Sequence, residues 1–121
     1  MRDIFLDFYL QENTMLENFR AYRLAVSFYR IATVIKLPRH LQDQLDRAAS
    51  SIALNLAEGA GRFSRNDQKR FFHIAFGSLR ECQAILDITG KSPEAAQLAD
   101  CLAAHIYKLI KSWGRKQPRH S

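Results

Sequence analysis

The stretch LQDQLDRAASSIALNLAEGAGR, residues 41–62, decides the fold. At 100° per residue its apolar residues fall on one arc of a helix, and a narrower polar arc lies beside them. Gly59 and Gly61 end the stretch, since glycine accepts the left-handed conformation that closes a last turn. The pattern predicts a helix over residues 38–60. Its apolar arc consists of Leu41, Leu45, Ala48, Ala49, Ile52, Ala53 and Leu56.

Helical spacing also precedes this stretch. Between residues 17 and 36, apolar residues recur at three- and four-residue steps, which predicts a first helix. Pro38 ends it, because the residue before a proline is pushed out of the α region. The expected core stripe is Tyr22, Ala25, Val26, Tyr29, Ala32 and Ile35.

The third expected helix is apolar over more than half of its circumference. Ser64 can cap its N-terminus, with Asp67 three residues on, and the pattern continues to Thr89. We therefore expect this helix to be buried from more than one side, by its own bundle and by another subunit. Its apolar residues are Phe71, Phe72, Ile74, Ala75, Phe76, Leu79, Cys82, Ile85, Leu86 and Ile88.

A fourth helix opens at Ser92-Pro93-Glu94, which combines an N-cap, a proline in the first turn and an acidic residue, and it ends near Gly114. Four such helices with short connections predict an all-α, up-down-up-down four-helix bundle. We divide the chain into an N-terminal arm (1–16), the bundle (17–114) and a basic tail (115–121). The fourth core stripe is Leu98, Leu102, Ile106, Leu109 and Trp113.

The composition suits a single domain of 121 residues, 47% of them hydrophobic. No segment approaches the roughly 20 apolar residues of a membrane span, so we expect a cytoplasmic protein. Cys82 and Cys101 fall on apolar faces without a Cys-x-x-Cys partner, which favours buried free thiols over a disulfide or a metal site. Gly59 and Gly77 are expected to permit close helix approach.

Positive charge is concentrated after residue 18, where 17 basic residues face 8 acidic ones. Two clusters could contact phosphates, although the same residues could simply solvate a helical surface. Aromatic residues lie mainly on core stripes, so base stacking is not expected. The candidates for nucleic-acid binding are Arg62, Arg65, Lys69, Arg70, Arg80, Lys111, Arg115, Lys116 and Arg119.

No pattern predicts catalysis, a cofactor or a metal site. The four histidines stand in four separate elements, and no nucleophile has a local base. Glu58 and Glu81 are the acids closest to apolar faces, and pairing with an arginine is a more common role for them than acid–base chemistry. We therefore expect a protein that is not an enzyme.

Two segments carry a family resemblance: DRAASSIALNLAEGAGR at residues 46–62, and Phe71 followed by IAFGSLRE at residues 74–81. Together they resemble the four-helix-bundle proteins encoded in intervening sequences of bacterial 23S ribosomal RNA genes. The resemblance covers about residues 19–88 and implies a ring-like homopentamer. A related branch, the accessory variability determinant of diversity-generating retroelements, implies a reverse transcriptase and nucleic acid as partners.

The polar arc fits this resemblance. Glu58 can pair with Arg62 four residues on, and Asn55 can bond a neighbouring backbone or side chain. We interpret the arc as a buried structural network that fixes helix register and partner choice, in preference to a ligand site. Its expected members are Arg47, Ser51, Asn55, Glu58, Arg62 and Glu81.

Two functions of different class follow. The first is an oligomeric scaffold that binds RNA or DNA through a basic surface, with weak contacts multiplied by the copy number of the ring. The second is a protein-interaction adaptor, for a reverse transcriptase or another acidic partner, that does not bind nucleic acid itself.

Overall fold

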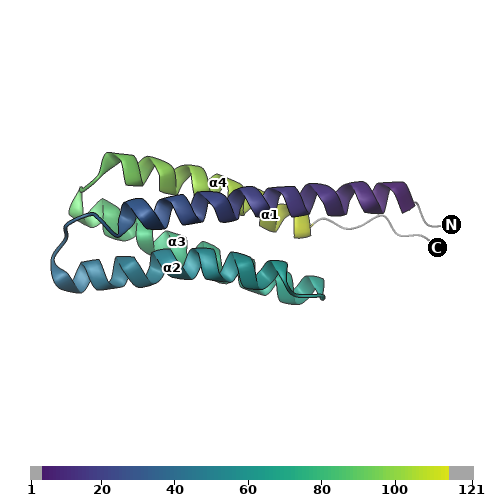
Figure 1. Cartoon of the computed structure of the whole chain (residues 1–121), viewed down its shortest axis with the longest axis horizontal. Coiled ribbons are helices and arrows are strands. Elements are labelled where there is room, and N and C mark those ends of the chain that lie inside the picture. The colour runs from purple at the N-terminus through teal and green to yellow at the C-terminus, as the bar shows by residue number, and fades with distance from the viewer. Residues whose placement is uncertain (1–3, 115–121) are drawn as a thin grey trace.

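The computed structural model describes residues 4–114, with side chains described for Met15 and for residues 17–112. Consecutive helices run in opposite directions, and the last packs back against the first (Figure 1). The predicted all-α, up-down four-helix bundle is therefore confirmed. No described helix is both long enough and apolar enough to cross a membrane. The helices are α1 (Ile4–Ala32), α2 (Arg39–Ala60), α3 (Arg65–Thr89) and α4 (Pro93–Gly114).

Caps close three of the helix ends that the sequence predicts, two through serine side chains and one through the backbone of a glycine. Ser64 precedes α3, and its Oγ accepts a hydrogen bond from the backbone N–H of Asp67 at 3.1 Å. Gly90 follows α3 with a φ of 62°, a left-handed conformation that glycine adopts without steric cost. Ser92 precedes α4, and its Oγ accepts from the N–H of Ala95 at 3.1 Å.

The first helix differs from its predicted bounds, residues 17–36. It begins at Ile4, because no glycine or proline interrupts the chain before Pro38. It ends at Ala32, where a β-branched run that disfavours helix begins. In Figure 1 the start of α1 projects past the other three helices. The separation of an arm at residues 1–16 stays a prediction.

The core face of α1 is also not the predicted stripe. Tyr22 and Tyr29 are each 38% exposed, whereas Ala25 and Ala32 are buried as predicted. Both faces show the same four- and three-residue steps, so spacing alone could not separate them. The tyrosine hydroxyls favour the face that keeps contact with water. The observed core residues of α1 are Ala21, Ala25, Phe28 and Ala32.

The other three helices bury most of their predicted stripes, but Ile74 and Ile88 of α3 remain exposed within the single chain. Of the two glycines expected at close helix approaches, Gly59 is buried against the side chain of Phe72, whereas Gly77 is exposed with open space around it. The expectation is therefore wrong for Gly77. The core of α2–α4 contains Leu45, Ala48, Ala49, Ile52, Leu56, Phe72, Ala75, Leu79, Cys82, Ile85, Leu86, Ala95, Ala99, Leu102, Ile106 and Leu109.

The cap at Ser64 gives a direct test of how the α2–α3 turn is held. Ser64→Ala removes the acceptor for the N–H of Asp67 and should lower the free energy of unfolding by about 1 kcal/mol. Ser64→Asp supplies a replacement acceptor and should retain most of the stability. Urea unfolding followed by circular dichroism measures both variants, and equal stability of Ser64→Ala and wild type would contradict the capping role.

Candidate functional site

Four basic residues gather where α2 turns into α3, and we call Arg62, Arg65, Lys69 and Arg70 the basic corner. The turn is short, since α2 ends at Ala60 and α3 begins at Arg65. Its first backbone N–H groups are bonded back to α2, from Gly61 to the carbonyl of Glu58 at 3.1 Å and from Arg62 to that of Gly59 at 3.2 Å. These hydrogen bonds hold the backbone of the turn that carries the basic corner.

Gly61 does not close α2 in the left-handed conformation that we expected. Its φ is −86° and its ψ is −3°, so it remains in the right-handed region. The final turn instead tightens through the hydrogen bond from the N–H of Gly61 three residues back to Glu58, which is common at helix ends.

One aromatic ring holds two guanidinium groups at the basic corner. The Arg62 guanidinium carbon lies 4.7 Å from the ring centroid of Phe71, and that of Arg70 lies 4.6 Å from it. Stacking on a ring leaves the N–H donors of a guanidinium directed away from the ring edge and able to bond phosphate. Phe71 thus fixes the position of two cations.

Each of these arginines also has a nearby acid. Arg62 Nη2 lies 3.1 Å from Glu58 Oε2, which is the pair that the four-residue spacing predicts, and Arg70 Nη2 lies 4.0 Å from Asp67 Oδ1. Both pairs are exposed, and such pairs contribute only about 0 to 1 kcal/mol. A phosphate could therefore replace either acid at small cost.

The remaining nucleic-acid candidates lie apart from the corner or outside the described residues. Arg80 is ten residues beyond Arg70 on α3, stacks over Phe76 at 5.0 Å and donates to Gln83 Oε1 at 2.9 Å. Lys111 is exposed near the end of α4, at the same end of the bundle as the α2–α3 turn (Figure 1). The tail residues Arg115, Lys116 and Arg119 lie outside the described residues.

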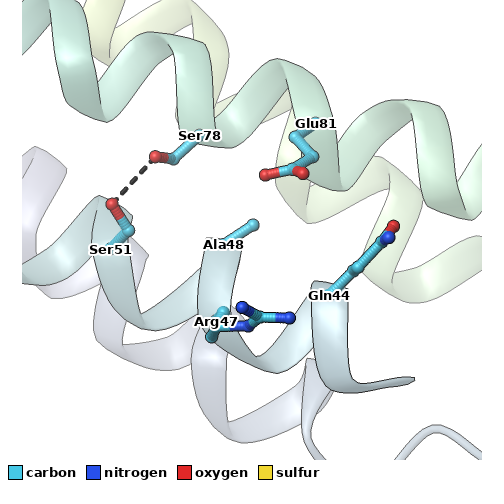
Figure 2. Close-up of a pocket in the computed structure, with 6 residues that line it drawn as sticks. All are labelled: Gln44, Arg47, Ala48, Ser51, Ser78 and Glu81. Atoms are coloured by element: carbon cyan, nitrogen blue, oxygen red, sulfur yellow. Dashed lines mark hydrogen bonds between the residues drawn. The ribbon is translucent and has the colours of Figure 1, made fainter. Parts of the chain in front are cut away.

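A second polar feature is a groove between α2 and α3 with a volume of about 510 Å³ (Figure 2). At its edge the hydroxyl oxygens of Ser51 and Ser78 lie 2.9 Å apart. Asn55 Nδ2 donates to the Ser51 carbonyl at 2.8 Å and to Ser51 Oγ at 3.0 Å. This polar groove is lined by Gln44, Arg47, Ala48, Ser51, Ser78 and Glu81.

The six residues of the predicted polar network do not form one buried network. Ser51 and Asn55 are bonded and half-buried, but the Glu58–Arg62 pair is exposed and belongs to the basic corner. Arg47 and Glu81 line the groove from opposite helices, and within the described part of the chain no ion pair joins them (Figure 2). The predicted network is therefore divided between two exposed places. Arg47, Ser51 and Glu81 line the polar groove, and Glu58 and Arg62 lie at the basic corner.

Glu58 and Glu81 are both exposed. The expected pairing with an arginine is confirmed for Glu58, through Arg62, whereas no ion pair joins Glu81 to an arginine among the described side chains. Burial, with a smaller contribution from the charge of Glu81, raises the pKa of the Cys82 thiol to about 12, so this cysteine stays protonated and unreactive at neutral pH. The expectation of a buried Cys101 is wrong, since its side chain is exposed, and both thiols are free.

The described histidines are also dispersed. His40 and His73 are exposed on α2 and α3, while His105 on α4 places its Nδ1 2.8 Å from Glu17 Oε1 on α1. His120 lies outside the described residues. Among the side chains that the structure describes, no three of His, Cys, Asp or Glu are grouped so that they could hold a metal ion.

Sequence reasoning missed two residues of these surfaces. Ser78 pairs with Ser51 across the helices, and at 100° per residue it falls between Phe71 and Ile85, inside the apolar arc of α3, where a hydroxyl is the signal of a polar contact between helices. Phe63 belongs to none of the predicted stripes. It lies between Gly61 and Ser64, which are both turn-forming residues. That position predicts that Phe63 lies in the connection and belongs to the apolar face of neither neighbouring helix.

Comparison with known families gives a match over most of the bundle. The family model described as 23S rRNA-intervening sequence protein matches residues 18–93. That range includes the whole of α2 and α3, the basic corner and the polar groove. A search of curated proteins found no match to the chain.

Proposed function

The chain belongs to the 23S rRNA-intervening sequence protein family, and from this premise we propose that it is a non-enzymatic, oligomeric scaffold that binds nucleic acid at its basic corner. The observation that carries the proposal is the gathering of four cations at the α2–α3 turn and in the first turns of α3, with two guanidinium groups stacked on Phe71. Cations held in place lose less conformational entropy when they bind phosphate than freely rotating ones.

The overall charge supports the same partner. After residue 18 the chain carries 17 basic and 8 acidic residues, an excess of 9 positive charges. A polyanion attracts such a surface over distances of about 10 Å at moderate salt, and binding releases its condensed counterions. Lys111, at the same end of the bundle as the basic corner, extends the positive surface onto α4.

An uncovered stripe on α1 supports assembly. Met15, Phe19, Tyr22, Val26 and Tyr29 recur at alternating steps of four and three, the spacing of a helix that packs against another helix. We call them the outer stripe. Met15 is 63% and Phe19 59% exposed in the single chain. We propose that a neighbouring copy covers the outer stripe in the homopentamer that the family resemblance implies.

A five-membered ring needs two different surfaces on each subunit, because the same contact repeats head to tail around the axis. The outer stripe supplies one surface. The exposed apolar side of α3, with Ile74 and Ile88, is available as the other. Five basic corners would then lie on one ring, and their combined avidity would exceed the affinity of one corner.

Fluorescence anisotropy tests the nucleic-acid function. Arg65→Glu/Lys69→Glu/Arg70→Glu should weaken binding to labelled RNA or DNA by about 100-fold or more at near-physiological salt. It should also reduce the slope of log K against log salt by about 3.

The matched control reverses three charges at the other end of the bundle, as Lys36→Glu/Arg39→Glu/Lys91→Glu, and should change affinity only a few-fold. These residues lie in or beside the connections opposite the basic corner (Figure 1). Equal losses in both triple variants would mean that net charge alone governs binding, and the basic corner would lose its assigned role.

The polar groove favours a second candidate function, a protein-interaction adaptor. Arg47 and Glu81 line it without an ion pair between them in the described chain, so they could bind charged groups on a polypeptide. A reverse transcriptase is the partner that the related branch implies. Failure to bind RNA and DNA at low salt, together with retained capture of one such protein, would favour the adaptor.

A further inference from the structure

Phe63 stands at the tip of the α2–α3 turn with a relative exposure of 105%, so its ring is not covered by any part of the chain that the structure describes. Leaving a phenylalanine in water forgoes burial worth roughly 1.5 to 3 kcal/mol. Phe63 is an exception to the expectation that the aromatic residues lie mainly on core stripes.

The backbone on both sides of Phe63 is hydrogen-bonded. The N–H of Arg62 donates to the Gly59 carbonyl at 3.2 Å. Ser64 accepts at its side chain from the N–H of Asp67 at 3.1 Å and at its carbonyl from the N–H of Gln68 at 3.0 Å. The ring is therefore presented from a fixed turn, and little backbone entropy is lost when it binds.

Cations flank Phe63 in the sequence, at the turn and in the first turns of α3. Arg62 precedes it directly, and the other three residues of the basic corner follow within seven positions. The outer stripe differs, since its exposed apolar residues follow one another along a helix and suit another helix. A single exposed ring among cations is the arrangement used to bind single-stranded nucleic acid, with the ring under a base and the cations on the phosphates.

We infer that Phe63 stacks on an unpaired base, so that the basic corner binds single-stranded nucleic acid or an unpaired loop in preference to a continuous duplex. This inference rests on the proposed nucleic-acid function. Bases inside a duplex already stack on both faces and offer none to a protruding ring, whereas an unpaired base does. Phe63 has no hydrogen-bonding group, so the contact should tolerate any base.

Anisotropy with two labelled probes of equal length, an oligothymidylate and a DNA duplex, tests the inference. Phe63→Ala should weaken binding to the single strand by about 5- to 100-fold. Binding to the duplex should stay within about 2-fold of wild type, because phosphate contacts do not involve the ring. Phe63→Leu, which keeps apolar bulk without a π face, should behave like Phe63→Ala.

Two further variants sharpen the result. Val34→Ala removes an exposed apolar side chain at the opposite end of the bundle and should leave both affinities unchanged. Phe63→Trp should retain single-strand affinity, and its fluorescence should be quenched when the oligothymidylate binds. Wild type, whose one tryptophan is Trp113, is the control for that quenching.

The outcomes separate this inference from the proposed function. If Phe63→Ala binds the single strand as wild type does while Arg65→Glu/Lys69→Glu/Arg70→Glu does not, the base contact is wrong and the basic corner stands. Equal losses on single strand and duplex, or a lower native mass for Phe63→Ala, would also overturn the inference, the latter by making Phe63 a subunit contact. If wild type binds neither probe, both proposals fail.

Discussion

Gly59→Ala is expected to lower the free energy of unfolding by about 2 kcal/mol, although alanine is the better helix former. A Cβ at this position would lie 2.6 Å from Cε1 of Phe72 and 3.1 Å from Cβ of Phe71. Phe72 is only 1% exposed and cannot move into solvent. The resulting overpacking costs about 3 kcal/mol, against about 1 kcal/mol gained in helix propensity.

Gly77→Ala is the matched control, because Gly77 also lies inside a helix but a Cβ added there would meet no neighbouring heavy atom within 4 Å among the described residues. Measured in the Phe19→Asp/Tyr22→Asp background, in which no neighbouring subunit would cover this side of α3, it should gain about 1 kcal/mol from propensity alone. The two variants should therefore differ in melting temperature by about 10 °C. Both must be melted in that same background and at one protein concentration, since the proposed assembly would make stability concentration-dependent. Equal losses in the two variants would contradict this account of Gly59.

The part of the fold that the sequence predicts best is the part where local chemistry and hydrophobic spacing agree. Ser64, Gly90 and Ser92 end or begin helices through caps that involve residues only a few positions away. Such contacts can be identified from sequence because they need no knowledge of the tertiary packing. The same holds for the Glu58–Arg62 pair, whose members lie one helical turn apart.

The features that the sequence could not predict depend on which helix face meets a neighbour. On α1 two apolar stripes share one spacing, and only the packing of α2 and α4 selects the one with Ala21 and Phe28. Cys101 is apolar enough to be assigned to the core, yet it faces water on α4. Residue type and spacing do not distinguish these cases.

The candidate site also has features that the sequence predicts and features that depend on packing. The cations of the basic corner could be identified from sequence because they are close together along the chain. The stacking of Arg62 and Arg70 on one ring could not, since it depends on how the turn brings the end of α2 beside α3. The contact between Ser51 and Ser78 also joins two helices and was therefore missed.

Phe19→Asp/Tyr22→Asp, in the outer stripe, is expected to reduce the native mass from that of an oligomer to that of the 13.9 kDa chain. In the proposed ring every subunit contact buries one copy of this stripe. Aromatic side chains bury about 150 to 250 Å² each, and an unpaired carboxylate in the same place would cost several kcal/mol. Every subunit contact loses this free energy, so we expect single subunits and no smaller oligomers.

Light scattering after size exclusion measures that mass, and far-ultraviolet circular dichroism checks that the helices remain. Gln97→Asp/Ala104→Asp introduces the same charge at two exposed positions of α4 and should leave the oligomer intact. The dissociated variant should retain the basic corner but lose avidity, so its affinity for a long nucleic acid should fall more than its affinity for a short one. An unchanged mass for Phe19→Asp/Tyr22→Asp would mean that no neighbouring subunit covers the outer stripe, and the exposed apolar side of α3 would become the surface to mutate.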